Sequence, residues 1–374
     1  MRIAILCSLL VLPGCVTGEE PAGDDNGGKD DIDVCKLERR YDNGTCDRTS
    51  FAGLACAKHD PDCPLLGPEP QRSRTQFPIL LHHGFAAGGE GIWSWRDVAA
   101  SLSRDGNVVV ASEVPPFGSL DDRATALARW VDKVLVDNQA ERVHIIAHSY
   151  GGLDARWVIS KFPDLAGKIA SLTTISTPHR GSYIADLTLG LLPEFSDPVV
   201  NMAAELIGKL FNSNSTTADV RAALEALKVQ DADVRNREFP EGETVDGDGF
   251  AANGVLYQSW AGVANVFGSP ENVDAVCEGK VLITPGTFDH IWPGLAPISP
   301  VIGRDGDVHD GMATVKSAKW GQFQGCIPTD HRDEVGQVTS RLGGLITSPT
   351  NPLTDWDHVR FYRQVVDGLA ARGL

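Results

Sequence analysis

A serine at position 149 lies where a strand-like run of residues gives way to a helix-like one. The segment 145–152 reads Ile-Ile-Ala-His-Ser-Tyr-Gly-Gly, so small residues, Ala147 and Gly151, stand two positions on either side of Ser149. A tight strand-to-helix turn strains the backbone of its serine and needs small neighbours, although the strict motif has glycine in place of Ala147. The following helix points its first N–H groups at negative charge forming beside the serine. We predict that Ser149 is a nucleophile; the alternative is a buried turn serine without chemical function.

Such a serine needs a histidine as its general base, and in this type of site the chain order is serine, acid, histidine. The chain has 10 His; five precede Ser149, and His179 lies too close to it in sequence, which leaves His290, His309, His331 and His358. His331 lies in the polar segment 330–337 and follows a plausible acid, Asp310. His358 begins an amphipathic helical pattern, in which capping and packing explain it. We therefore favour His331 over His358 as the base.

Acyl transfer also needs two hydrogen-bond donors directed at the developing oxyanion. One candidate is the backbone N–H of Tyr150, directly after the serine. The second is expected in the loop after the first strand, where the segment 81–85 reads Leu-His-His-Gly-Phe. We predict that the N–H of Phe85 faces the site, and that His82 and His83 stabilise the loop rather than act as bases.

The elements that must position these residues alternate between short apolar runs and amphipathic runs from residue 76 onward. The predicted strands are 77–82, 107–112, 142–147 and 169–175, and the predicted helices include 92–102 and 121–136. This alternation favours an α/β fold with a mostly parallel sheet covered by helices on both faces. Functional residues of such sheets lie at the carboxyl ends of the strands, where Ser149 is found.

The segment 184–250 breaks this alternation. It contains apolar helical stretches at 199–211 and an amphipathic one at 218–228. We interpret it as an inserted helical lid above the sheet, with an apolar underside that covers a groove for an acyl chain. The alternative is ordinary core packing.

Composition restricts the possible partners. The chain has 33 Lys plus Arg against 50 Asp plus Glu, a formal net charge of −17, with 42% hydrophobic and 22% charged residues. These fractions are ordinary for a globular protein. A surface of this charge repels phosphate backbones, so nucleic-acid binding is not expected.

The first 34 residues predict export. Arg2 precedes an apolar run, 3–12, which is too short to span a membrane and is followed by Pro-Gly-Cys15. We interpret 1–14 as a lipoprotein signal peptide, Cys15 as the lipidated residue and 15–34 as an acidic flexible tether. The proline at position 13 is unusual in such a box and leaves ordinary signal cleavage as the alternative. The expected location is the outer membrane or cell surface, with membrane contact through the anchor, or the medium after secretion.

Cysteine usage fits an oxidising compartment. Beyond the leader and the lipidation site, six of the 8 Cys remain, and four of them form a cluster in 35–66: Cys35, Cys46, Cys56 and Cys63. We interpret 35–66 as a small module with two disulfides of open pairing, with one further bridge in the main domain. Zinc binding is the competing interpretation of the cluster, and the carboxylates of the module could hold Ca²⁺ or simply be solvated turns.

Several motifs together resemble one enzyme family. They are the segments 147–153, 172–182, 257–262, 310–312 and 331–337, with Ser317 and Gly321. In this order, over about residues 76–374, they are similar to the foldase-dependent triacylglycerol lipases secreted by Gram-negative bacteria. The resemblance implies an α/β-hydrolase fold, a Ser149–Asp310–His331 triad, a lipid or ester substrate and a lipase-specific folding chaperone.

The same resemblance implies a structural Ca²⁺ that holds the loop of His331. Its ligands would be the side chains of Asp333 and Gln337, the carbonyl of Arg341 and an upstream acid, Asp289. The spacing of Asp289 differs by one residue from the family pattern, so Asp305 or Asp307 is an alternative, and exposed acids without an ion are the simpler explanation. The resemblance also implies an intramolecular bridge, which would be Cys277–Cys326.

The function predicted from these features is hydrolysis of water-insoluble carboxylic esters, as in a triacylglycerol lipase, through an acyl-enzyme. A short-chain esterase or a polyester depolymerase is the alternative within this chemistry. A surface-anchored binding lipoprotein without catalysis is the alternative of a different class.

Overall fold

The computed structural model describes residues 70, 72–85, 95–195, 217–266, 272–282, 289–337 and 356–374, with 198–201, 203 and 205. The signal peptide 1–14, the tether 15–34 and the cysteine module 35–66 lie outside the described residues, as do Cys15 and Arg341.

A six-stranded sheet forms the centre of the molecule, in the order β2-β1-β3-β4-β5-β8, and all neighbouring strands run parallel. Its strands are β1 Ile79–His82, β2 Val109–Ala111, β3 Val143–His148, β4 Ile169–Ile175, β5 Leu256–Gly262 and β8 Gln322–Ile327. The predicted α/β-hydrolase sheet is therefore confirmed. The four predicted strands are present, but the prediction missed β5 and β8. Their polar residues, such as Gln258 and Gln322, break the apolar runs on which strand prediction relies.

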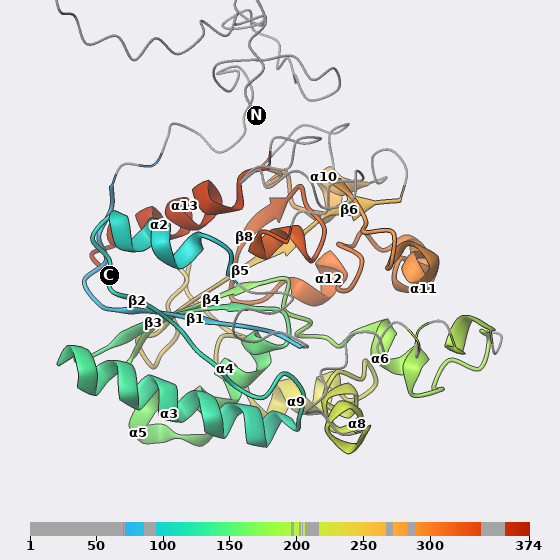
Figure 1. The fold of residues 1–374 in the computed structure, drawn as a ribbon, viewed down its shortest axis with the longest axis horizontal. Helices are drawn as coiled ribbons and strands as arrows, with labels where there is room; N and C mark the ends of the chain where they lie inside the picture. The colour runs from blue at the N-terminus through green and yellow to red at the C-terminus, as the bar shows by residue number, and fades with distance from the viewer. Residues whose placement is uncertain are drawn as a thin grey trace, which may run out of the picture.

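Helices cover both faces of this sheet (Figure 1). Helices α2 Val98–Arg104 and α13 His358–Ala370 pack on one face. Helices α3 Leu120–Asn138, α4 Gly151–Lys161 and α5 Pro163–Ala166 pack on the other. The hydroxyl of Ser119 caps α3 by accepting a hydrogen bond from the N–H of Asp122. Helix α2 begins later than the predicted range 92–102, of which 92–94 lie outside the described residues.

A third group of elements lies at the carboxyl end of the strands, at the right of Figure 1. It includes α6 Tyr183–Thr188, α8 Thr217–Ala226 and α11 Ser299–Ile302, whose apolar residues form a separate cluster. Helix α8 corresponds to the predicted stretch 218–228, whereas most of the predicted stretch 199–211 lies outside the described residues. The remaining elements are α9 Ala232–Glu238, α10 Val273–Val276, α12 Val315–Ala318, β6 Ala264–Asn265, β7 Asp289–His290 and the 3₁₀ turns Ala296–Ile298, Arg304–Gly306 and Asp333–Val335.

A disulfide joins Cys277, at the end of α10, to Cys326 in β8, with the two Cα atoms 5.7 Å apart. This is the pair that the family resemblance implied. It closes a sequence separation of 49 residues and connects β8 to the segment that precedes β7.

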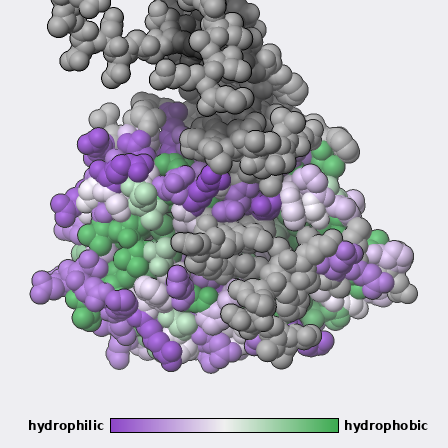
Figure 2. Space-filling model, in the orientation of Figure 1, coloured by the Kyte–Doolittle hydropathy of each residue, from purple (hydrophilic) through white to green (hydrophobic). Residues whose placement is uncertain are grey.

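The surface mixes polar and apolar residues on the face that Figure 2 shows. In the described part of the chain, the large apolar side chains that are exposed are Val108, Val136, Leu191 and Val234. None of the described helices combines the length and the apolar character that crossing a bilayer requires.

Candidate active site

Ser149 occupies the turn between β3 and α4. Its φ is +57°, a left-handed conformation that costs energy for a residue with a Cβ. The turn is held because the N–H of Ser149 donates to the carbonyl of Ile175, at the end of β4, over 2.9 Å. The side chain is thereby placed at the carboxyl end of the sheet, and the residue is 9% exposed.

The structure brings Ser149, His331 and Asp310 together. The hydroxyl of Ser149 lies 2.8 Å from Nε2 of His331, and Nδ1 of His331 lies 2.6 Å from Oδ2 of Asp310. An ionised Asp310 accepts the Nδ1 proton, which leaves Nε2 free to accept the hydroxyl proton. A serine in this arrangement can be deprotonated as it attacks an electrophilic carbon.

The environment of Asp310 keeps its carboxylate ionised although it is fully buried. Burial alone would raise its pKa, but the imidazole of His331 and its hydrogen bond outweigh that effect and lower the pKa to about 2. The backbone N–H groups of Met312 and Ala313 also donate to Oδ1 of Asp310, over 2.8 and 2.7 Å. A fixed anion in this position orients the His331 ring and stabilises its cation.

The loop after β1 lies directly against the serine. A Cβ built on Gly84 would approach the Cβ of Ser149 to 2.6 Å, so only glycine allows this contact. Phe85, the next residue, is buried and packs its ring edge-on against Phe117. Tyr150, whose N–H was the other predicted donor, is fully buried after Ser149. Phe85 lines the same cavity as Ser149, and Tyr150 follows the serine directly in the chain.

A buried arginine, Arg123, holds the loop that follows β1. The guanidinium of Arg123 donates to Oδ2 of Asp154 through Nε (3.0 Å) and through Nη2 (2.7 Å), and Nη2 also donates to the carbonyl of His83 (3.0 Å). His82 contacts the same Asp154 oxygen through Nε2, at 2.9 Å. The side chains of Arg123, Asp154 and His82 are all 0% exposed.

His82 and His83 have structural positions, as predicted. The Nδ1 of His82 lies 2.7 Å from the hydroxyl of Ser112, and the N–H of Val114 donates to Nε2 of His83. Burial lowers the pKa of His83 to about 3, so it stays neutral as an acceptor. Sequence reasoning missed Arg123 and Asp154, because they lie 31 positions apart and form no recognisable motif.

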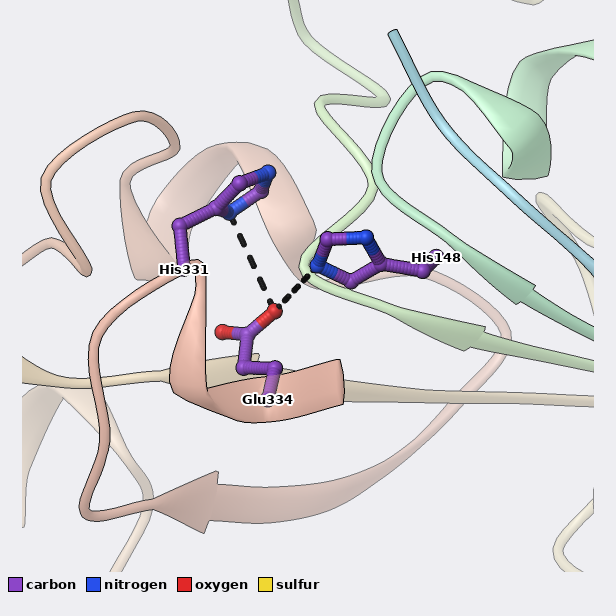
Figure 3. Close-up of side chains that lie close together, drawn as sticks. All are labelled: His148, His331 and Glu334. Carbon is purple, nitrogen blue, oxygen red and sulfur yellow. Dashed lines mark hydrogen bonds and ion pairs between the residues drawn. The ribbon is translucent and has the colours of Figure 1, made fainter. Parts of the chain in front are cut away.

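A second carboxyl group, Glu334, lies beside His331 (Figure 3). Its Oε2 is 2.8 Å from Nε2 of His148 and 3.8 Å from Nδ1 of His331. The hydroxyl of Ser176 donates to its Oε1 over 2.6 Å. A Cβ on Gly262 would come within 2.0 Å of that oxygen, so this glycine makes room for the carboxyl group.

Burial raises the pKa of Glu334 well above its ordinary value, and the neighbouring Asp310 adds to the effect. Burial and the neighbouring His331 lower the pKa of His148 well below its ordinary value. Glu334 therefore contributes hydrogen bonds that join the end of β3 to the loop of His331. It belongs to the segment 331–337 that the resemblance singled out, but nothing in its spacing indicated this contact.

A small, mostly apolar cavity opens onto Ser149 and His331. Its volume is about 30 Å³, and its lining includes residues of α6 and of the α8 segment. The lining residues are Phe85, Ser149, Pro178, Ser182, Ile184, Ala185, Leu224, Leu227, Met312, Ala313 and His331. This volume is far below the roughly 300 Å³ of a typical ligand pocket, so a lipid substrate would need more space than the cavity offers in this structure.

The other histidine candidates lie elsewhere. His358 begins α13, and its Nε2 donates a hydrogen bond to the carbonyl of Arg96 over 2.8 Å. Nδ1 of His309 accepts from the N–H of Gly311 over 3.0 Å. His290 ends β7. None of these three is bonded to Ser149 in the described part of the chain.

The predicted calcium ligands are described only in part. Asp333 begins the 3₁₀ turn two residues after His331 and is buried, and Gln337 follows that turn half-buried. The carboxylate of Asp330 anchors the turn by accepting from the N–H of Arg332 and of Asp333, each over 2.9 Å. Asp289 begins β7, but its side chain lies outside the described residues, as does the whole of Arg341.

Comparisons with known proteins identify the family of the chain. A family model of the α/β-hydrolase fold matches residues 78–293. A triacylglycerol lipase of Vibrio cholerae is 34% identical over 316 residues, which cover 81% of this chain and 90% of the relative. A triacylglycerol lipase of Burkholderia plantarii is 28% identical over 304 residues, covering 74% of this chain and 83% of the relative.

Among solved structures, a metagenomic carboxyl esterase has a TM-score of 0.53 at 18% identity and covers 92% of this chain and 90% of its own. A Staphylococcus hyicus lipase has a TM-score of 0.51 at 16% identity, covering 81% and 97%. These two likenesses concern the fold. The chain thus belongs to the α/β-hydrolase family. Within that family, its curated relatives include bacterial triacylglycerol lipases.

Proposed function

We propose that this chain is a carboxylic ester hydrolase that cleaves water-insoluble esters, triacylglycerols among them, through an acyl-enzyme. The observation that carries the proposal is the hydrogen-bonded series Ser149–His331–Asp310, which opens onto an apolar cavity. The relation to triacylglycerol lipases supports the class of substrate.

In the proposed reaction, the hydroxyl oxygen of Ser149 attacks the ester carbonyl while its proton passes to Nε2 of His331. The imidazolium is stabilised by Asp310. The negative oxygen of the tetrahedral intermediate accepts hydrogen bonds from the N–H groups of Phe85 and Tyr150. His331 then protonates the leaving alcohol. A water molecule, deprotonated by the same imidazole, releases the fatty acid and restores Ser149.

We also propose that α6 and the α8 segment form the lid predicted for 184–250. Ile184 and Ala185 of α6 and Leu224 of α8 line the cavity at the serine. Outward movement of these helices would widen the cavity and expose an apolar underside to a lipid surface.

A substrate panel tests the activity and its closest alternatives. We expect hydrolysis of p-nitrophenyl esters from butyrate to palmitate and of emulsified trioctanoin, because the cavity is apolar and its covering helices can move apart. Release of p-nitrophenol and of titratable acid are the measurements. Cleavage of the butyrate ester alone would instead assign a short-chain esterase, and degradation of a polyester film would assign a depolymerase. A chain that hydrolyses no ester would support the non-catalytic binding protein.

A structural Ca²⁺ is the proposed cofactor. The donor chemistry fits, because Asp333 supplies a buried carboxylate and Gln337 an amide oxygen on the turn directly after His331. Asp289 and the carbonyl of Arg341 would complete the set. The ion would hold this turn in place, so its contribution to the reaction would be the position of the imidazole.

Chelation is expected to lower thermal stability and esterase activity together, and added Ca²⁺ to restore both. Asp333→Asn should reduce the chelator effect, whereas Asp305→Asn, which alters an exposed alternative ligand, should leave it unchanged. The melting temperature with and without EDTA is the primary measurement. An unchanged melting temperature would remove Ca²⁺ from the proposal.

Export with a lipid anchor at Cys15 and assistance by a lipase-specific folding chaperone complete the proposal. They rest on the residues before Cys15 and on the resemblance to secreted lipases. Mass spectrometry of the mature amino terminus measures the anchor directly, since an unmodified terminus would contradict it.

A further inference from the structure

A second cavity lies next to the first and differs from it in chemistry. Its volume is about 110 Å³, larger than the cavity at the serine. Its lining combines charged and polar residues with a few apolar ones and includes Arg180, Ser182, Tyr183, Asp307, Met312 and Lys316.

The two cavities share a wall. Ser182 and Met312 line both of them, and the hydroxyl of Ser182 donates to the carbonyl of Met312 over 2.8 Å. Met312 also belongs to the loop of Asp310, since its N–H donates to that carboxylate. A group bound in the second cavity would therefore lie one side chain away from the reacting serine.

The charges of the second cavity favour an anion. Arg180 and Lys316 both line it, and within the described residues neither forms an ion pair with a carboxylate, although Arg180 donates to the carbonyl of Lys319. Asp307 is the single carboxylate in the lining that the structure describes, so the lining carries a net positive charge in a chain whose net charge is −17. Burial, and then the nearby Asp307, raise the pKa of Tyr183, so its hydroxyl remains a hydrogen-bond donor.

An ester has two halves that leave the reacting carbonyl in different directions. The apolar lining at Ser149 suits the acyl half. The polar second cavity would receive the alcohol half. A neutral diacylglycerol would form no ion pair with Arg180 or Lys316 of that cavity. A phosphate on the alcohol half could form such a pair, because guanidinium and ammonium groups pair with phosphate oxygens.

We propose that the cavity between Arg180 and Lys316 is an alcohol-side subsite for a phosphate group, so that the enzyme prefers acylglycerols whose glycerol carries a phosphate over neutral ones of the same acyl chain. The inference rests on the proposed ester hydrolase function and specifies its substrate class. The covalent step is unchanged: Ser149 takes the acyl group, His331 protonates the departing glycerol phosphate, and water releases the fatty acid.

Two substrates with one acyl chain test this subsite. We would compare 1-oleoyl-lysophosphatidic acid with 1-monooleoylglycerol in the same neutral detergent micelle. The wild-type chain is expected to have the lower KM for the phosphate ester. Lys316→Gln should raise that KM about fivefold with kcat little changed, because one exposed cation contributes a modest electrostatic attraction, and should leave the neutral ester unaffected.

Lys319→Gln is the matched control, since Lys319 lies three residues further on but is paired with Glu278 at 2.8 Å and does not line the cavity. An equal KM increase in both variants would mean general attraction to a charged micelle and would overturn the subsite. So would a wild-type chain that does not distinguish the two esters. A chain that cleaves p-nitrophenyl esters or trioctanoin but neither oleoyl ester would also overturn the subsite. A chain that cleaves none of these esters would instead refute the proposed function, so the two failures are distinguishable.

Discussion

Replacing Ser149 by alanine is expected to reduce kcat by about five to six orders of magnitude while leaving the melting temperature close to that of the parent chain. The loss is large because the covalent route disappears, and only substrate binding and the oxyanion donors remain. His331→Ala should cost a similar factor. The double variant should be little worse than either single one, because the two residues act as a unit. Turnover of a p-nitrophenyl ester and labelling by a fluorophosphonate are the measurements.

The chain offers a matched control for this experiment. Ser171 is also a buried serine hydrogen-bonded to a histidine, since its hydroxyl lies 2.8 Å from Nδ1 of His144. It lies within β4, and in the described part of the chain no carboxylate contacts the histidine. Ser171→Ala should keep both activity and labelling. Labelling that survives in Ser149→Ala would contradict the assignment of the nucleophile.

The second large effect is expected at Arg123. Arg123→Met leaves the carboxylate of Asp154 buried without a cationic partner and with the imidazole of His82 as its remaining side-chain contact, which should cost about 3–5 kcal/mol of unfolding free energy. It also frees the carbonyl of His83, one residue before the glycine that contacts the serine. The N–H of Phe85 then loses its fixed position, and kcat per folded molecule should fall about 10²- to 10³-fold. Urea unfolding and turnover per fluorophosphonate-labelled site measure the two effects separately.

Two further variants separate stability from turnover. Arg156 is another buried arginine, but its contacts are Glu243, at 3.1 Å, and residues outside the site. Arg156→Met should therefore lower stability without changing turnover per labelled site. In the double variant Arg123→Met/Asp154→Leu the buried charge is gone, so part of the stability should return while turnover stays low. Full turnover per labelled site in Arg123→Met would show that the arginine does not hold the oxyanion loop.

The sheet and the three reacting residues could be predicted because their signals are local. The turn at Ser149 is encoded by consecutive residues, and the order of serine, acid and histidine limits the choice of base. The strand β4, Ile169–Ile175, has the predicted bounds, and every residue in it is buried. Helix α3 was predicted nearly in full because its apolar stripe repeats at helical spacing.

The supporting contacts could not be predicted, because they join residues that are distant in sequence. Glu334 lies 186 positions from His148 and 158 from Ser176. Its neighbours in sequence give no indication of burial, because the segment 330–333 directly before it contains three charged residues. Only the folded chain shows that its carboxyl group enters the space that Gly262 leaves open. The segment 184–250 raised a different difficulty, since apolar helical stretches are equally typical of a core and of a lid.

The sheet order has a consequence for synthesis on the ribosome. Ser149 follows β3, near the middle of the sheet, whereas His331 follows β8, which pairs with β5 at the far edge and is the last strand of the sheet along the chain. A nascent chain can complete the serine turn long before the imidazole has been translated. Partly made or carboxyl-truncated chains should therefore be inert toward esters, and competence should arise only when β8 docks beside β5.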